Sequence, residues 1–203
     1  MVNNKPPSRA AARRQAMLEA ATALFLEKGF DATTLSDILE RSGGSRTTFY
    51  AQFGGKDGML RTIIQESSAA VWEKVRWRNG PPPLTEEELV EYGCVFSAAV
   101  SDPDVVAVYR IVFAESRRIP GVAELFMDTG PRMIFSQLTE WFSAALEAGR
   151  LKAASVEDLV QAYVGLVLGD QHLDCGLTCL TPDPEATRRY IRGAVRIFLH
   201  GAG

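Results

Sequence analysis

The residues best suited to contact a partner molecule lie between positions 41 and 60, in the run RSGGSRTTFYAQFGGKDGML. The pair Gly43-Gly44 precedes a set of small hydrogen-bonding side chains, and a second glycine pair precedes Lys56. The segment is too short and too polar to form a core helix. Because its side chains are small, another molecule could approach the backbone closely. We therefore interpret the segment as a contact surface.

Helical periodicity and capping residues predict that this surface belongs to a three-helix unit. A first helix is expected over about 9–28, and a second over about 34–42 that starts at Thr34-x-x-Asp37. Gly43-Gly44 would turn the chain, and Ser45 would cap a third helix that ends near residue 53. Two short helices joined by a tight turn and crossed by a third are typical of a helix-turn-helix DNA-binding unit.

The third predicted helix would read the DNA. Arg46 is the one long donor that could reach a guanine edge, and the threonines after it can touch a thymine methyl or a phosphate. The alternative for Arg46 is a solvated helix-start residue, whereas Phe49 and Phe53 are expected in the core. The predicted DNA-binding residues are Thr34, Ser45, Arg46, Thr47, Thr48, Tyr50, Gln52 and Lys56.

Charge is divided unevenly along the 203 residues. The net charge is −3, yet residues 1–61 carry +3 and the remainder carries −6. With 46% hydrophobic and 23% charged residues the composition is globular. No apolar run approaches the roughly 18–20 residues of a membrane span, and the basic start has no apolar secretion segment. We expect a cytoplasmic protein with no membrane partner, in which a basic head and an acidic body have separate functions.

The rest of the chain also has helical periodicity, so we predict an all-α fold of about nine helices. The further helices are expected over about 56–78, 85–100, 102–119, 122–148 (broken or not at Gly130-Pro131), 155–176 and 183–200. We predict a disordered arm over 1–8, a helix-turn-helix DNA-binding domain over 9–55, and an effector-binding and dimerisation domain over 56–203.

The run TTLSDILERSGGSRTTFYAQFGGKDGML is similar along its whole length to the N-terminal domain of TetR-family transcriptional regulators. The positions that fit the family pattern are Thr34, Gly43, Ser45, Thr48, Tyr50, Phe53, Lys56, Asp57 and Leu60. Gly44 replaces a small aliphatic residue, Thr47 a common glycine and Gln52 a frequent histidine. The C-terminal part resembles the AefR-like subgroup through VFAESRRIPGVAELF and GLVLGD.

The resemblance implies a ligand-responsive regulator that binds double-stranded DNA. Such a function needs a homodimer, because one short reading helix covers too few base pairs, and two heads would read a palindromic operator. We predict a repressor that a small apolar or amphipathic effector releases. Activation by the ligand stays open. The implied effector site lies among aromatic residues that could instead be core. The candidates are Phe96, Tyr109, Phe113, Phe126 and Trp141, with Asp170 or His172 as polar anchors.

Apolar residues also recur along the last two predicted helices. They would suit a contact of four helices between two copies of the chain, which would place two reading helices about one DNA turn apart. Alternatively, they close the core of the chain itself. The candidate dimer residues are Leu159, Tyr163, Leu166, Ile191, Val195 and Phe198.

Other classes of protein have little support. There is no glycine-rich phosphate loop and no nucleophile elbow, so we predict no catalysis. His172, Cys175 and Cys179 have near-helical spacing but no fourth ligand, so core thiols are favoured over a metal site. No cofactor or metal is expected. The alternative function is an all-helical small-molecule binding protein without DNA-binding activity, which the departures at Gly44, Thr47 and Gln52 keep open.

Overall fold

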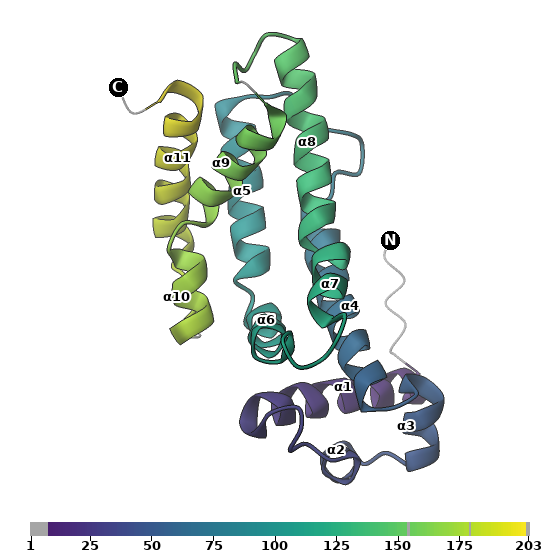
Figure 1. Ribbon diagram of the computed structural model, residues 1–203. Coiled ribbons are helices and arrows are strands. Elements are labelled where there is room, and N and C mark those ends of the chain that lie inside the picture. Colours follow the sequence, from purple (N-terminus) through teal and green to yellow (C-terminus); the bar gives the residue numbers. More distant parts are fainter. Residues whose placement is uncertain (1–7, 154, 179, 202–203) are drawn as a thin grey trace. The chain divides into compact units, whose positions relative to one another are not determined.

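The structure, a computed structural model, describes residues 8–153, 155–178 and 180–201. Every regular element in these ranges is an α-helix, which confirms the predicted all-α fold (Figure 1). The helices are α1 Arg9–Lys28, α2 Leu35–Ser42, α3 Arg46–Phe53, α4 Lys56–Val75, α5 Glu86–Val100, α6 Pro103–Glu115, α7 Val122–Thr129, α8 Pro131–Glu147, α9 Val156–Leu168, α10 Gln171–Thr178 and α11 Pro184–His200. None of them has the length and apolar character that a membrane span requires.

The described ranges contain eleven helices where nine were expected, because two expected helices are each interrupted by a glycine. Gly130 and Pro131 divide the expected helix 122–148 into α7 and α8. Gly169 divides the expected helix 155–176 into α9 and α10, and it has a left-handed φ of 51°. The hydroxyl of Tyr190 occupies the space that a Cβ atom at Gly169 would need. The predicted arm over 1–8 lies outside the described residues except for Ser8, which caps α1.

The chain packs as two compact units. Unit 1 contains the described residues up to Glu66 together with Ala107–Leu125, and unit 2 contains Ser67–Val106 with the described residues from Phe126 onward. The divisions fall inside α4, α6 and α7. The domain boundary predicted at 55/56 was drawn on function and stays a prediction. Packing instead places the first turns of α4 with α1–α3.

Unit 1 is built on a core that α4 shares with the three preceding helices. Met17, Ile38 and Leu60 are completely buried. Phe49 and Phe53 are buried on one side of α3, with ring centroids 5.4 Å apart, as expected from their i, i+4 spacing. The buried side of α3 therefore fixes which of its residues face outward.

The core of unit 2 lies mainly among α4, α5, α8, α9 and α11. The Tyr163 hydroxyl at its centre donates to the Leu89 carbonyl at 2.6 Å. A Cβ atom at Gly93 would lie 2.9 Å from Ile191, so the glycine lets α5 and α11 approach closely. An ion-pair ladder joins the same two helices. It consists of Arg188 with Glu87 and Glu91, Arg192 with Glu87, and Arg196 with Glu86.

This core contains most of the residues proposed for a dimer contact. Leu159, Tyr163, Ile191 and Val195 are buried within the single chain. Phe198 packs its ring 5.5 Å from those of Phe142 and Tyr163. Because the four buried residues already pack against their own chain, they offer no surface to a second copy. These stripes thus contribute to the chain's own core, with Leu166 and Phe198 half-buried, and the dimer contact stays a prediction.

Candidate nucleic-acid interface

The turn between α2 and α3 is fixed by one glycine and one serine. Gly43 has φ 69° and donates its backbone N–H to the Leu39 carbonyl at 2.8 Å, which ends α2. The Ser45 hydroxyl accepts the backbone N–H of Thr48 at 3.2 Å, which starts α3. Two consecutive short helices are thus joined by a tight turn, which is the geometry expected of a helix-turn-helix unit.

The outer side of α3 carries the side chains that were predicted to read DNA. Arg46, Thr47, Tyr50 and Gln52 are exposed, and 55% of the Tyr50 surface is accessible. Arg46 donates from Nη2 to the Ser36 hydroxyl of α2 at 2.9 Å. The arginine therefore has a preferred position across the two helices while its other donors face solvent.

Two of the eight predicted contact residues, Thr34 and Ser45, are helix caps, and a third, Thr48, is bonded to one of them. The Thr34 hydroxyl accepts the backbone N–H of Asp37 at 3.2 Å, and the Asp37 carboxylate accepts that of Thr34 at 2.7 Å. This is the capping box expected from the sequence. Ser45 and Thr48 join their hydroxyls at 2.8 Å. A contact from any of the three to a phosphate would have to use the hydrogen-bonding capacity left over from these caps.

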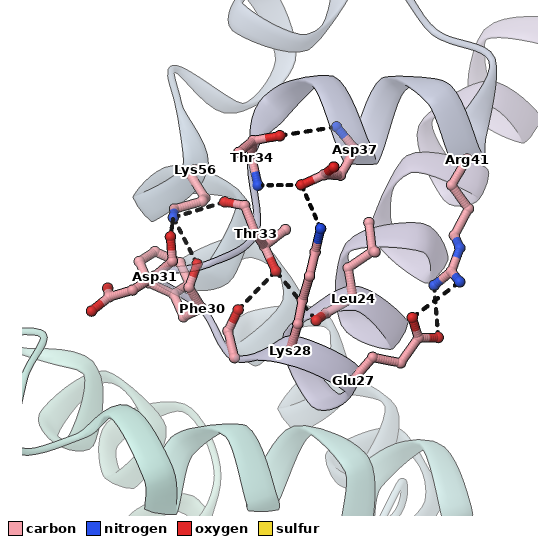
Figure 2. A network of polar contacts seen from close by, with 11 residues as sticks. Leu24, Glu27, Lys28, Phe30, Asp31, Thr33, Thr34, Asp37, Arg41 and Lys56 are labelled. Atoms are coloured by element: carbon pink, nitrogen blue, oxygen red, sulfur yellow. Dashed lines mark hydrogen bonds and ion pairs between the residues drawn. The ribbon is translucent and has the colours of Figure 1, made fainter.

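Lys56 has a different role from the one expected. Its ammonium donates to the carbonyls of Phe30, Asp31 and Thr33 at 2.7, 3.3 and 3.0 Å and lies 4.4 Å from the centroid of the Phe30 ring (Figure 2). An ammonium has three N–H donors, so all are used inside the chain. In this arrangement Lys56 has no donor left for a phosphate, and the expectation that it grips one stays a prediction. Its ammonium instead holds three carbonyls of the loop between α1 and α2 in place.

Charged side chains tie both the first and the last turn of α2 to the end of α1 (Figure 2). The Lys28 ammonium lies 2.6 Å from the Asp37 carboxylate, and Arg41 holds Glu27 through two hydrogen bonds. The contact from Lys28, aided by the capping bonds at Thr34, lowers the pKa of Asp37 far below its usual value. Asp37 therefore stays ionised, and the start of α2 keeps its position on α1.

A segment distant in sequence contacts the α1–α2 loop within unit 1. The buried carboxylate of Glu115, at the end of α6, accepts the backbone N–H of Phe30 at 3.4 Å. Arg118 forms an ion pair with Asp31, and Arg61 donates to the Pro120 carbonyl at 3.1 Å. The loop that leads into the helix-turn-helix is therefore held by α4 through Lys56 and by the end of α6 through Glu115.

Unit 2 contains an open groove of about 500 Å³. Its lining residues are Trp72, Trp77, Gly80, Pro81, Asp128, Arg132, Met133, Ser136, Gln137 and Glu140. None of the seven predicted effector residues lines it. Phe96 and Trp141 are buried in the core of unit 2, while Asp170 is exposed and His172 and Phe126 are half-buried there. Tyr109 and Phe113 belong to unit 1, where their rings form an edge contact with centroids 4.4 Å apart.

The residues that line the groove were not selected from the sequence, although their spacing places several of them together. Met133, Gln137 and Glu140 recur at helical spacing on α8, and Trp72 and Trp77 lie near the end of α4.

The sequence also offered a weak metal candidate at His172, Cys175 and Cys179. Of these residues, Cys175 is buried and Cys179 lies outside the described residues. In the described part of the chain no three His, Cys, Asp or Glu side chains are grouped to hold a metal ion.

The three-helix unit, its tight turn and the exposed polar side of α3 define a helix-turn-helix protein of the DNA-binding class. Comparison with known proteins specifies the family. Residues 17–63 match the model for bacterial regulatory proteins of the TetR family, and residues 87–201 match that for the C-terminal domain of AefR-like transcriptional repressors. The chain belongs to the TetR family, which confirms the resemblance drawn from the sequence.

Individual relatives agree with this assignment. The repressor Rv3405c of Mycobacterium tuberculosis is 30% identical over 117 residues, 58% of each chain. The repressor ComR of Escherichia coli is 39% identical over 51 residues, 25% of this chain and 24% of its own. The alignments thus span from about a quarter to 58% of these relatives. Among solved structures, the flavonoid-responsive regulator FrrA is 26% identical with a TM-score of 0.72, over 92% of this chain and 95% of its own.

Proposed function

We propose that the protein is a ligand-responsive, DNA-binding transcriptional regulator of the cytoplasm, and that it represses transcription from a palindromic operator. The observation that supports this best is the arrangement of α3. Buried Phe49 and Phe53 anchor one side of the helix, so that Arg46, Thr47 and Tyr50 are presented together on the other. In the major groove, Arg46 would donate to a guanine edge. Its bond to Ser36 already restricts the side chain, so binding to DNA would cost less side-chain conformational entropy.

A palindromic operator requires two reading helices, so the proposal includes a homodimer. Since the buried stripes are used within the chain, the contact would use the opposite sides of α9 and α11. Small and apolar residues are accessible there: Ala162, Gly165, Leu166, Tyr190, Gly193 and Ile197. Glycine and alanine at a helix surface let two helices approach closely, and Ile197 is 49% exposed.

Effector binding would act on the head through helices that continue from unit 2 into unit 1. These helices are α4 and α6. The first residue of α4, Lys56, and the last residue of α6, Glu115, both form hydrogen bonds to the α1–α2 loop. A shift of either helix would move the loop and with it the start of α2. To release DNA, an apolar or amphipathic effector would have to favour the shifted state, and a typical coupling is about 1–3 kcal/mol.

The test is fluorescence anisotropy of the full chain on labelled DNA from upstream of its own gene and on a scrambled duplex. A random-sequence selection supplies the operator if that DNA does not. We expect selective binding that weakens steeply with salt, because phosphate contacts release counterions. Arg46→Glu should abolish it, whereas Arg150→Glu, an exposed change in unit 2, should not. Failure to select any sequence would support the alternative function, a helical small-molecule binder without DNA activity. If Arg46→Glu bound DNA as well as Arg150→Glu, Arg46 would not be a reading residue of α3.

A further inference from the structure

The groove of unit 2 combines two indole side chains with acidic groups. Trp72 and Trp77 are half-buried and line one part of it, and α8 lines another with Met133 and Glu140. Its volume of about 500 Å³ falls within the range of small-molecule sites in proteins. Large aromatic side chains bury much ligand area at a small cost in side-chain entropy.

The bottom of the groove is held in place by hydrogen bonds. Buried Gln137 donates to the Val75 carbonyl and to the Tyr92 hydroxyl, at 3.1 and 3.0 Å, and its side-chain oxygen accepts the backbone N–H of Trp77 at 3.1 Å. The Trp77 ring packs edge-on against Trp141 with centroids 5.3 Å apart. Because these side chains are already ordered, a ligand would not have to order them on binding.

The charges that line the groove favour a positive ligand. Arg132 forms an ion pair with Asp128 one turn away, so these two charges offset each other. Glu140 remains, and it has no ion-pair partner among the residues that the structure describes. The lining therefore has a net charge of −1. Indole rings attract cations through the negative face of their π-system, which adds to the preference.

We propose that this groove is the effector site and that its ligand is an aromatic organic cation. The inference rests on the proposed function for the consequence of binding, but the binding itself can be measured without DNA. The cation would lie against Trp72 and Trp77 with its charge toward Glu140, and its apolar part would contact Met133. This assignment replaces the seven effector residues expected from the sequence.

The probe is tetraphenylphosphonium, and its control is tetraphenylborate, an anion of nearly the same shape. Both are titrated into the full chain without DNA by calorimetry. We expect the cation to bind and the anion to bind at least about tenfold more weakly, since only the sign of the charge differs. Glu140→Gln should weaken cation binding by about threefold or more, whereas Glu147→Gln, elsewhere on α8, should leave it unchanged. Trp72→Phe should weaken it and keep the helical circular dichroism.

Equal binding of the two probes, or a Glu140→Gln variant that binds the cation like the unaltered chain, would overturn the assignment. A second arm adds the cation to the protein–DNA complex. Release from operator DNA by the cation but not by the anion supports the effector role, and binding without release overturns that role. If no operator is found at all, the proposed function fails while the calorimetry still decides whether the groove takes cations.

Discussion

The Met17 side chain occupies the space that a Cβ atom at Gly44 would need. A methyl group built on Gly44 would clash with the end of Met17, and Leu39 would lie 3.2 Å away. Met17 is completely buried. The departure from the family pattern at Gly44 therefore has a structural reason, since the turn of the helix-turn-helix is small where α1 contributes a long side chain.

This pairing predicts that changes at the two positions are coupled. Gly44→Ala alone should destabilise the chain by about 1 kcal/mol through overpacking, since the atom that must move is the end of the flexible Met17 side chain. Met17→Ala alone should cost about 2–5 kcal/mol, because it leaves a cavity. The double variant should lose about 1 kcal/mol less stability than the sum of the two single losses, since the new methyl group fills part of the cavity. Urea unfolding of all four proteins measures the coupling, and additive losses would contradict it.

Lys56→Met should weaken DNA binding without changing its dependence on salt. Removing the ammonium leaves three loop carbonyls without their donor, which should destabilise unit 1 by about 1–3 kcal/mol. A lysine on a phosphate would instead contribute about 0.9 to the slope of log affinity against log salt. Anisotropy at four salt concentrations separates the two. A slope that falls by about one would show that Lys56 leaves the loop and contacts DNA.

The ion pair between Lys28 and Asp37 should make the start of α2 sensitive to acid. The pKa of Asp37 is lowered chiefly by its contact with Lys28, so ionised Asp37 stabilises the folded chain above its unfolded pKa of about 3.9. This contribution is lost as the pH falls below that value. Asp37→Asn should therefore melt at a lower temperature than the unaltered chain at pH 6, and the difference should shrink toward pH 3. A difference that is constant with pH would show that the charge of Asp37 does not stabilise the folded chain.

The proposed dimer should dissociate when a charge is placed on the accessible side of α11. Ile197→Asp should give monomers in sedimentation experiments, because a carboxylate would be buried without a partner at the contact. Arg150→Asp, an exposed change outside α9 and α11, is the control and should remain dimeric. Since two reading helices bind one operator, the monomer should also lose affinity by far more than twofold. A dimeric Ile197→Asp variant would place the interface elsewhere.

The DNA-reading part of the fold could be predicted because its signals are local. Thr34 and Ser45 cap the helices that follow them, and Gly43 ends α2, so nearby residues determine each boundary. The role of Lys56 could not be predicted in the same way, because the carbonyls that it binds lie 23–26 positions away. Likewise, the period of α9 and α11 locates their apolar stripes but does not show whether another helix of the same chain covers them.

The three carbonyls around Lys56 also decide which fragment of the chain can fold by itself. They surround the ammonium as they would surround a bound metal cation. The positive charge that these loop carbonyls bind therefore belongs to a residue of α4. A fragment cut at residue 55 would lose that cation together with buried Met59 and Leu60. A head that keeps its packing therefore extends well into α4, to about residue 66. It also needs residues 107–125, which carry Glu115 and Arg118, so a hybrid regulator should exchange both segments.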